Sequence, residues 1–309
     1  NKMPPTPPTG KLPMTEAEFR CGSIAIVGRP TAGKSTLLNH LIGQKISITS
    51  RKPQTTRHRL LGIVTKPDAQ YLFLDKPGLQ THYQSALNKA MGRSIASALD
   101  EANVILWVLE GLDFDTREQH LRRLIPADRP VIAAINKLDR LADKRQLLPH
   151  LARLAQEYNF AAMVPVSAKQ GAGLDDLLRA LRLHLPQGEA IYPEDEMTDR
   201  DERFLAAEAI REKLMRNMGD EIPYAVHVDI IQFKMEGETR RIEAEIIVTR
   251  DNHKAMVIGK GGEKLKTIGS AARQDLEKLF GGKVFLGLWV KVKTDWVDDQ
   301  TLLRNYGYN

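Results

Sequence analysis

Two short motifs about a hundred residues apart constrain the fold of this chain more than any other feature. Gly28 to Ser35 reads G-x-x-x-x-G-K-S, the pattern of a phosphate-binding loop between a strand and a helix. Asn136 to Asp139 reads N-K-x-D. An aspartate carboxylate accepts a pair of N–H donors, which guanine offers and adenine does not. The two motifs together predict an α/β domain that binds GTP or GDP.

The sequence around the phosphate loop supports this interpretation. Residues 24–27 form an apolar run suited to a buried parallel strand, and residues 35–42 have the pattern of a helix whose N-terminus points at the phosphates. Lys34 is expected to contact the outer phosphates, and the Ser35 hydroxyl to ligate Mg²⁺. The predicted nucleotide contacts in this segment are Gly28, Arg29, Pro30, Thr31, Ala32, Gly33, Lys34, Ser35 and Thr36.

A third motif follows a predicted hairpin. Alternating residues at 60–65 and 71–74, with a turn between them, predict two antiparallel strands at the sheet edge. The next residues read D-x-P-G. An aspartate opposite the Ser35 hydroxyl can orient a water of the metal, and a glycine N–H can contact the γ-phosphate. This motif adds Asp75, Lys76, Pro77 and Gly78 to the predicted site, with Asp75 near the metal.

Three further apolar runs, at 104–109, 131–135 and 163–166, predict buried strands. Ligands bind beyond the carboxyl ends of the strands in open α/β sheets. We therefore expect the residues that follow the last two strands to contact the base. These are Asn136, Lys137 and Asp139 after one strand, and Ser167, Ala168 and Lys169 after the other. An amphipathic helix over 174–185 closes the domain.

Composition indicates a two-domain cytoplasmic protein. The chain has 309 residues, enough for two ordinary cores. Its one cysteine, Cys21, excludes an intrachain disulfide, is expected to be a packing residue, and favours a reducing compartment. No run of 18 apolar residues is present, so we expect no membrane span. Residues 1–20 are expected to form a disordered extension, because residues 1–12 are rich in proline and threonine.

The charge of the second half is unevenly distributed. Residues 190–249 carry 8 Lys/Arg against 15 Asp/Glu, whereas residues 250–293 carry 10 against 4. The basic segment contains G-x-x-G at Gly259 to Gly262, between two predicted helices at 251–257 and 263–280. A helix over 199–218 and strands at 224–233, 241–249 and 284–293 complete an α-β-β-α-α-β order. This order is that of a type II KH domain, in which a glycine loop lets an RNA backbone approach closely.

A polar stretch at residues 45–59 holds Thr49, Thr55 and Thr56 and is called the threonine-bearing loop. Taken together, the phosphate loop, this threonine-bearing loop, D-x-P-G, N-K-x-D and S-A-K (residues 167–169) occur in the order that is typical of translation-factor-class GTPases. The run Gln54-Thr-Thr-Arg-His58 and the second domain resemble the Era family, over residues 22–298. The resemblance implies a P-loop GTPase domain with a mostly parallel sheet at 21–187, a linker at 188–198, and an α+β type II KH domain with a C-terminal tail at 199–309.

The resemblance also implies a function. Members of the Era family hydrolyse GTP with Mg²⁺ and bind the single-stranded 3′ end of small-subunit ribosomal RNA during maturation of that subunit. We therefore expect a cytoplasmic, monomeric GTPase whose partner is a 30S-type particle, and we leave open a peripheral association with the inner membrane. Two alternatives stay open: a nucleotide-gated RNA-binding protein with insignificant hydrolysis, and a GTP-dependent RNA-modifying enzyme. The second is disfavoured because the second domain has no Cys/His cluster and no nucleophile constellation.

Several positions bear on catalysis. By analogy with related GTPases, Thr56 is the expected metal ligand, with Thr55 as the alternative, and Lys34, Thr56 and Gly78 are the expected catalytic groups. The family usually has Asn, which helps to coordinate an activating potassium ion, where this chain has Thr31, and this difference argues against potassium activation. Lys76 replaces the usual Thr and is expected to face solvent, the alternative being that it neutralises developing charge. Leu79 stands where some GTPases have a water-orienting Gln, so slow hydrolysis is expected.

The predicted RNA contacts surround the glycine loop. Basic side chains there would face phosphates, and apolar residues flank the loop at helical spacing. Trp296 is expected either to stack on a base or to cover the end of the domain. The predicted RNA-binding residues are Lys254, Ile258, Gly259, Lys260, Gly261, Gly262, Lys264, Lys266, Arg273, Lys283 and Lys293.

Overall fold

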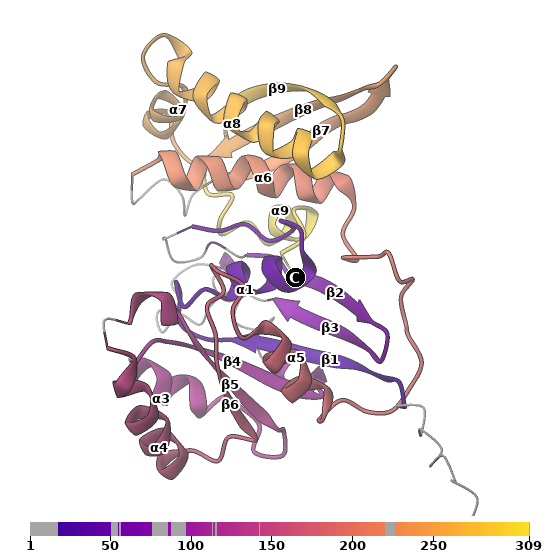
Figure 1. Cartoon of the computed structure of the whole chain (residues 1–309). Helices are drawn as coiled ribbons and strands as arrows, with labels where there is room; N and C mark the ends of the chain where they lie inside the picture. The colour runs from indigo at the N-terminus through magenta and orange to yellow at the C-terminus, as the bar shows by residue number, and fades with distance from the viewer. Residues whose placement is uncertain are drawn as a thin grey trace, which may run out of the picture.

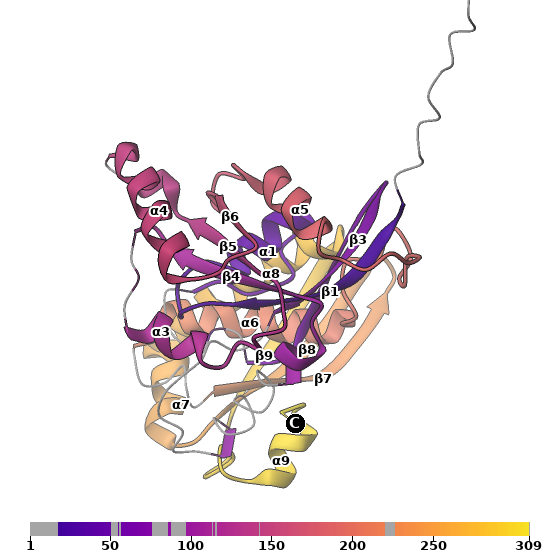
Figure 2. The ribbon, with the colours of Figure 1, turned by 90° about the horizontal axis from the view of Figure 1, so that it is seen from below.

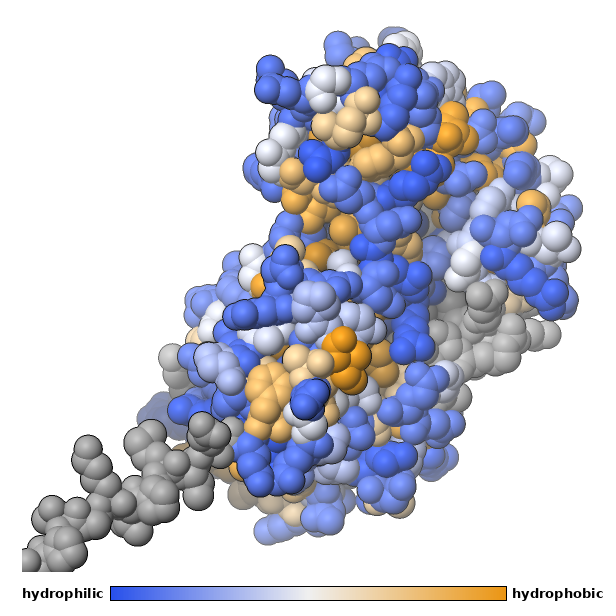
Figure 3. Space-filling model, turned by 90° about the vertical axis from the view of Figure 1, so that its right-hand side faces the viewer, coloured by the Kyte–Doolittle hydropathy of each residue, from blue (hydrophilic) through white to orange (hydrophobic). Residues whose placement is uncertain are grey.

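The computed structural model contains two domains, each built around its own sheet, and the first domain lies below the second in Figure 1. Within the part of the chain that it describes, every helix is too short or too polar to span a lipid bilayer. The surface in Figure 3 is largely hydrophilic, and its apolar groups are interrupted by polar side chains. The described residues are 18–50, 55, 57–75, 86–87, 97–112, 114, 116–141, 143–219 and 226–308.

A six-stranded sheet with the order β2-β3-β1-β4-β5-β6 forms the centre of the first domain. Neighbouring strands are parallel except β2, which pairs antiparallel with β3 at the edge. The predicted hairpin and mostly parallel sheet are therefore confirmed. Arg20, predicted to belong to the N-terminal extension, instead begins β1. The strands are β1 Arg20–Val27, β2 Leu60–Lys66, β3 Ala69–Asp75, β4 Val104–Glu110, β5 Val131–Asn136 and β6 Ala162–Pro165.

Helices cover both faces of this sheet, as the view from below shows (Figure 2). Leucines of α1 and α5 pack into the core on one face, and the apolar side of the amphipathic helix predicted at 174–185 is buried there. Leu121 of α3 and Leu154 of α4 belong to the core on the other face. The helices are α1 Lys34–Ile42, α3 Thr116–Arg122, α4 Leu147–Glu157 and α5 Leu174–Arg182, with short 3-10 turns η1 Leu138–Arg140 and η2 Lys144–Gln146.

The segment between the domains lies along the first domain. The side-chain oxygen of buried Gln70 in β3 accepts hydrogen bonds from the N–H groups of Ile191 (2.8 Å) and Tyr192 (3.0 Å). Farther on, the N–H of Ile63 in β2 donates to the carbonyl of Met197 at 2.9 Å. The predicted linker is thus attached to the sheet edge, and it delivers the chain to the next helix beside the first domain.

The second domain is a three-stranded sheet, β7-β8-β9, covered on one face by helices. Strands β7 and β8 are antiparallel, whereas β8 and β9 are parallel. Its core contains Ile210 of α6, Ile246 of β8, and Ile268 and Leu276 of α8. The elements are α6 Glu202–Asn217, β7 Val226–Glu236, β8 Thr239–Val248, α7 Asp251–Ile258, η4 Lys260–Gly262, α8 Glu263–Phe280 and β9 Lys283–Val292. This order confirms the predicted KH fold.

The last described segment carries α9 Gln300–Asn305 and packs between the domains. Trp296 is fully buried in a cluster with Leu87 of the first domain, Ile247 of β8 and Tyr308. A buried indole has no face left for a base, so of the two predicted roles for Trp296, stacking on RNA is wrong and covering the end of the domain is confirmed.

Candidate nucleotide and RNA sites

The phosphate loop connects β1 to α1, and two of its glycines are required by its geometry. Gly28 has φ +148°, and an added Cβ would lie 2.4 Å from the carbonyl oxygen of Val108. Gly33 has φ +101°, and an added Cβ would lie 2.3 Å from the side-chain nitrogen of Asn136. The loop therefore turns tightly against β4 and β5, which brings the two predicted motifs into contact.

Lys34 lies inside this loop. Its buried ammonium group donates to the carbonyl oxygens of Gly28 and Arg29, both at 2.8 Å. Burial lowers the pKa of Lys34 to about 8, although the carboxylates of Asp75 and Glu118 oppose this shift. A phosphate group in the loop would add further negative charge, which favours the protonated amine. The position fits the predicted contact with the outer phosphates.

The expected metal position lies between α1 and the end of β3. The hydroxyl of Ser35 donates to Asp75 Oδ2 at 3.3 Å, and the hydroxyl of Ser47 donates to the same oxygen at 2.9 Å. Asp75 is fully buried at this point. Hydroxyl and carboxylate oxygens are the ligands Mg²⁺ takes beside phosphate and water, so this donor set fits the metal. The contact of Ser47 was not predicted, because its loop showed only a general polar composition.

The residues that are predicted to contact the base gather around Asn136 at the end of β5. Its side-chain nitrogen donates to the carbonyl of Ala32 at 2.8 Å, and its oxygen accepts from the N–H of Ala168 at 2.9 Å. The Ser167 hydroxyl donates to Asp139 Oδ1 at 2.7 Å, and this hydrogen bond is the main reason why the pKa of the exposed Asp139 carboxyl is lowered. The structure thus joins three predicted motifs around one site, and it keeps the exposed carboxylate of Asp139 ionised, as the predicted contact with guanine requires.

Charged contacts that the sequence did not reveal support both loops. Arg29 Nε lies 3.0 Å from Glu118, whose other oxygen accepts from the indole of Trp107 at 2.8 Å. Lys137 of the N-K-x-D motif pairs with Glu110 at the end of β4. These carboxylates come from α3 and β4, and no spacing in the sequence links them to the motifs.

Part of the predicted site lies outside the described residues, namely Thr56, Lys76, Pro77 and Gly78. Their roles stay predictions. Thr55 is described, and its carbonyl oxygen accepts a hydrogen bond from Arg211 of α6. The threonine-bearing loop therefore touches the second domain next to the expected metal ligand.

The predicted RNA loop joins α7 to α8. Gly259, Gly261 and Gly262 have φ of +74°, +60° and +79°, and a Cβ on Gly259 would lie 2.6 Å from the Cβ of Lys264. Nothing lies within 4 Å of a Cβ added to Gly261, so the backbone there is open to an approaching chain. Lys260 is exposed beside it.

The structure divides the predicted basic residues into two groups. Lys254, Lys264 and Lys266 lie on the helices that adjoin the loop, with Ile258 at the end of α7. The expectation that Lys283 lies around the loop is wrong, because it begins β9 beyond the far end of α8, a helix about 27 Å long. Arg273 pairs with Glu277, and Lys293 donates to the Tyr306 hydroxyl at 2.9 Å.

Family models match both domains. A model described as a 50S ribosome-binding GTPase matches residues 23–137, and a KH domain model matches residues 221–297. Among solved structures, an Era variant from Aquifex aeolicus bound to GDP and AlF4⁻ has a TM-score of 0.90 and 39% identity, covering 94% of this chain and 99% of its own. Era in complex with MgGDPNP and nucleotides 1506–1542 of 16S ribosomal RNA has a TM-score of 0.89 and 40% identity, with the same two coverages.

Curated relatives are similar over nearly the whole chain. GTPase Era of Chromobacterium violaceum is 50% identical over 294 residues, which are 95% of this chain and 99% of the relative. GTPase Era of Nitrosomonas eutropha is 51% identical over 295 residues, which are 96% of this chain and all of the relative. With both domains, their order and the arrangement of the nucleotide motifs in agreement, the chain belongs to the Era family of GTPases.

Proposed function

We propose that this GTPase binds single-stranded small-subunit ribosomal RNA near its 3′ end through the glycine loop of its KH domain, and assists maturation of the small subunit. One observation carries the proposal: an open, positively charged glycine loop occurs in the same chain as a complete set of guanine-nucleotide motifs. The relative solved with MgGDPNP and 16S ribosomal RNA supports the assignment of this RNA class. A 30S-type particle as partner, a monomeric state and a cytoplasmic location stay predictions.

The nucleotide site suggests how hydrolysis proceeds. The N–H groups of the phosphate loop and Lys34 would hold the phosphates, and Asp139 would hold the guanine edge. When bound, Mg²⁺ supplies positive charge beside the β- and γ-phosphates. Ser35 and Thr56 would ligate this ion, Asp75 would orient its water, and the N–H of Gly78 would face the γ-phosphate. Since Leu79 cannot orient water, we propose that catalysis relies on positioning and electrostatics.

The RNA assignment is tested by the double variant Lys260→Asp with Gly261→Asp. Both side chains would oppose phosphates, and Asp tolerates the left-handed backbone of residue 261, where an added Cβ meets nothing within 4 Å. We expect RNA binding to be lost while GTP affinity stays within about threefold, because the nucleotide motifs lie in the other domain. Lys283→Asp is the matched control, since Lys283 is exposed but lies at the other end of α8.

Filter binding at two salt concentrations provides the measurement, with circular dichroism as the test of folding. Up to four lysines near the loop would displace counterions, which predicts a slope of about −3 in log affinity against log salt for the parent. Phosphate release with and without RNA shows whether hydrolysis responds to RNA. A folded double variant that binds RNA as tightly as the parent would show that the glycine loop is only a turn.

A further inference from the structure

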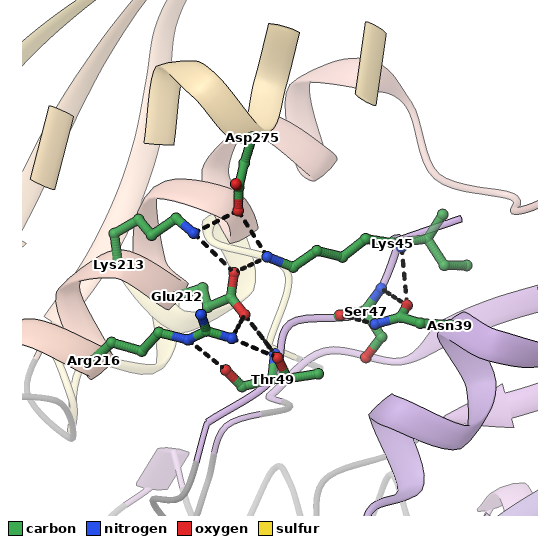
Figure 4. A network of polar contacts seen from close by, with 9 residues as sticks. Asn39, Lys45, Ser47, Thr49, Glu212, Lys213, Arg216 and Asp275 are labelled. Carbon is green, nitrogen blue, oxygen red and sulfur yellow. Dashed lines mark hydrogen bonds and ion pairs between the residues drawn. The ribbon is translucent and has the colours of Figure 1, made fainter. Parts of the chain in front are cut away.

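Thr49, in the loop between α1 and β2, is held by two side chains of the second domain (Figure 4). Its N–H and its hydroxyl donate to Glu212 Oε1 at 3.0 and 2.9 Å. Arg216 donates to its carbonyl oxygen at 3.1 Å and to its hydroxyl at 2.7 Å. Every polar group of Thr49 is therefore bonded to α6, and none of these contacts comes from the first domain.

Glu212 is buried at the centre of this contact. Its side chain has no exposed area, and one oxygen pairs with Lys45 of the first domain while the other accepts from Arg216 at 2.7 Å. A buried carboxylate is stable only when charges and donors surround it. Because Lys45 and Thr49 supply several of them, burial of Glu212 requires the loop to lie against α6.

The same loop reaches the expected metal position. Ser47, two residues before Thr49, donates to Asp75 Oδ2 at 2.9 Å. Asn39 of α1 accepts from the N–H of Ser47 at 2.8 Å and so fixes the other side of the loop. A cavity of about 280 Å³ lies between this loop and helices α6 and α8, and it is lined in part by Ile48, Leu205 and Leu279. Ile46 anchors the loop in the core of the first domain, and the polar contacts of Thr49 attach the loop to α6.

A further contact continues from this loop into α8. Asp275 of α8 accepts from Lys45 at 2.7 Å and from Lys213 of α6. Burial acts to raise the pKa of the Asp275 carboxyl, but the hydrogen bonds from Lys213 and Lys45 outweigh it and hold the pKa below its usual value. Helix α8 begins at Glu263, directly after the glycine loop. The contacts thus form a continuous physical path from Asp75 to the helix that carries the predicted RNA site.

We propose that Glu212 and Arg216 are positioning residues for GTP hydrolysis, and that the second domain acts on the nucleotide site through their hold on Thr49. Fixing Thr49 sets the Ser47–Asp75 contact and the start of the segment leading to residue 56. Its release leaves the loop in many arrangements, of which few are competent for hydrolysis. GDP has no γ-phosphate for the loop to contact, so its affinity depends little on Thr49. The extension of this coupling to RNA rests on the proposed function.

The experiment uses four full-length proteins: the parent, Glu212→Gln, Thr49→Val and the control Glu202→Gln. Glu202 lies on the same helix and pairs with Arg240, at 3.1 Å, within the second domain. Steady-state hydrolysis gives kcat and KM for GTP, and titration gives the Kd of GDP. Fluorescence anisotropy of a single-stranded RNA with the small-subunit 3′-end sequence gives the ratio of affinities with a non-hydrolysable GTP analogue and with GDP.

We expect Glu212→Gln and Thr49→Val to lower kcat about fivefold or more with the Kd of GDP within about twofold, and to move the RNA affinity ratio towards one. Glu202→Gln should match the parent. An unchanged or raised kcat in folded Thr49→Val and Glu212→Gln would overturn the proposal, as would equal losses in kcat and GDP affinity, which indicate a merely structural role. If the Glu212→Gln protein does not fold, the result for Thr49→Val alone decides whether the proposal holds. If the parent protein binds no RNA, the proposed function is contradicted. The kcat values of the variants still test whether Glu212 and Thr49 position the nucleotide site.

Discussion

Replacing Thr31 by Asn is expected to stabilise the first domain. Thr31 lies in the phosphate loop with φ of 71°, and its side chain is exposed. The left-handed region costs L-residues roughly 1–2 kcal/mol, and a β-branched side chain there is an outlier, whereas Asn is tolerated. Because the side chain is exposed, no neighbour has to move to accommodate Asn, so most of the free energy that the strained backbone costs should be regained. We expect the free energy of unfolding to rise by about 1 kcal/mol and Tm by about 2–4 °C.

Thermal unfolding of the nucleotide-free protein measures this effect. Thr31→Val is the matched control, because it keeps the β-branch and therefore the strain while it removes the hydroxyl. It should give no increase in Tm. A second readout is phosphate release in potassium and in sodium salts at equal ionic strength. The resemblance to the Era family implies that an amide oxygen at this position helps to coordinate potassium, so Thr31→Asn should confer or increase potassium stimulation.

The two readouts test different parts of the reasoning. If Tm stays unchanged in the Thr31→Asn protein, the left-handed backbone at this position is not strained. A rise in Tm without potassium stimulation would confirm the strain argument. It would also show that an amide oxygen at residue 31 is not sufficient for potassium activation. Stimulation of the parent by potassium to the same degree would show that a threonine hydroxyl is sufficient.

Three other substitutions give further expectations. Asp139→Asn should weaken GTP binding by about 2–3 kcal/mol, since it removes a charge-assisted acceptor, and should improve binding of xanthosine triphosphate, since the amide can donate to the oxygen that xanthine has in place of the guanine amino group. Unchanged GTP affinity in titration calorimetry would remove Asp139 from base recognition. Lys76→Thr should change the hydrolysis rate by less than about tenfold, or ~1.4 kcal/mol in the barrier; loss of turnover in a phosphate-release assay would make Lys76 a catalytic cation. Trp296→Ala should cost about 3–5 kcal/mol in denaturant unfolding, as for a large core residue; a small cost would contradict its role in packing.

The sequence predicted the secondary structure well where the signal is local. The apolar run at 131–135 became β5, which ends at Asn136, and the helix predicted at 263–280 has those limits in the structure. Strand and helix periods depend on residues a few positions apart, and glycine loops depend on backbone angles that few residues adopt. Both kinds of signal are visible in a single chain.

The contacts that support the site were not predictable in this way. Glu118 reaches Arg29, and Glu212 reaches Thr49, from helices far along the chain. Lys283 shows that a predicted contact can also be absent. The basic pattern of the sequence groups Lys283 with the lysines of the glycine loop, but the length of α8 separates it from that loop. For Trp296 the sequence left two roles open, because the residues that bury it come from both domains. Tertiary arrangement, which a single sequence does not encode by spacing, decides all of these.

Besides the apolar cluster around Trp296, the domain junction also buries charged groups. Next to Tyr308 the junction buries Arg57, Glu208 and Arg211 and partly buries His58, whose pKa is lowered to about 4 by desolvation. Charges taken out of water carry a desolvation penalty that offsets much of their mutual attraction, whereas separation of the domains would let water replace these partners. The polar part of this junction holds one arrangement by specific contacts yet costs less to open than an apolar surface of similar size. We therefore expect the relative placement of the domains to respond to ligands whose binding energies are modest, as coupling through Thr49 requires.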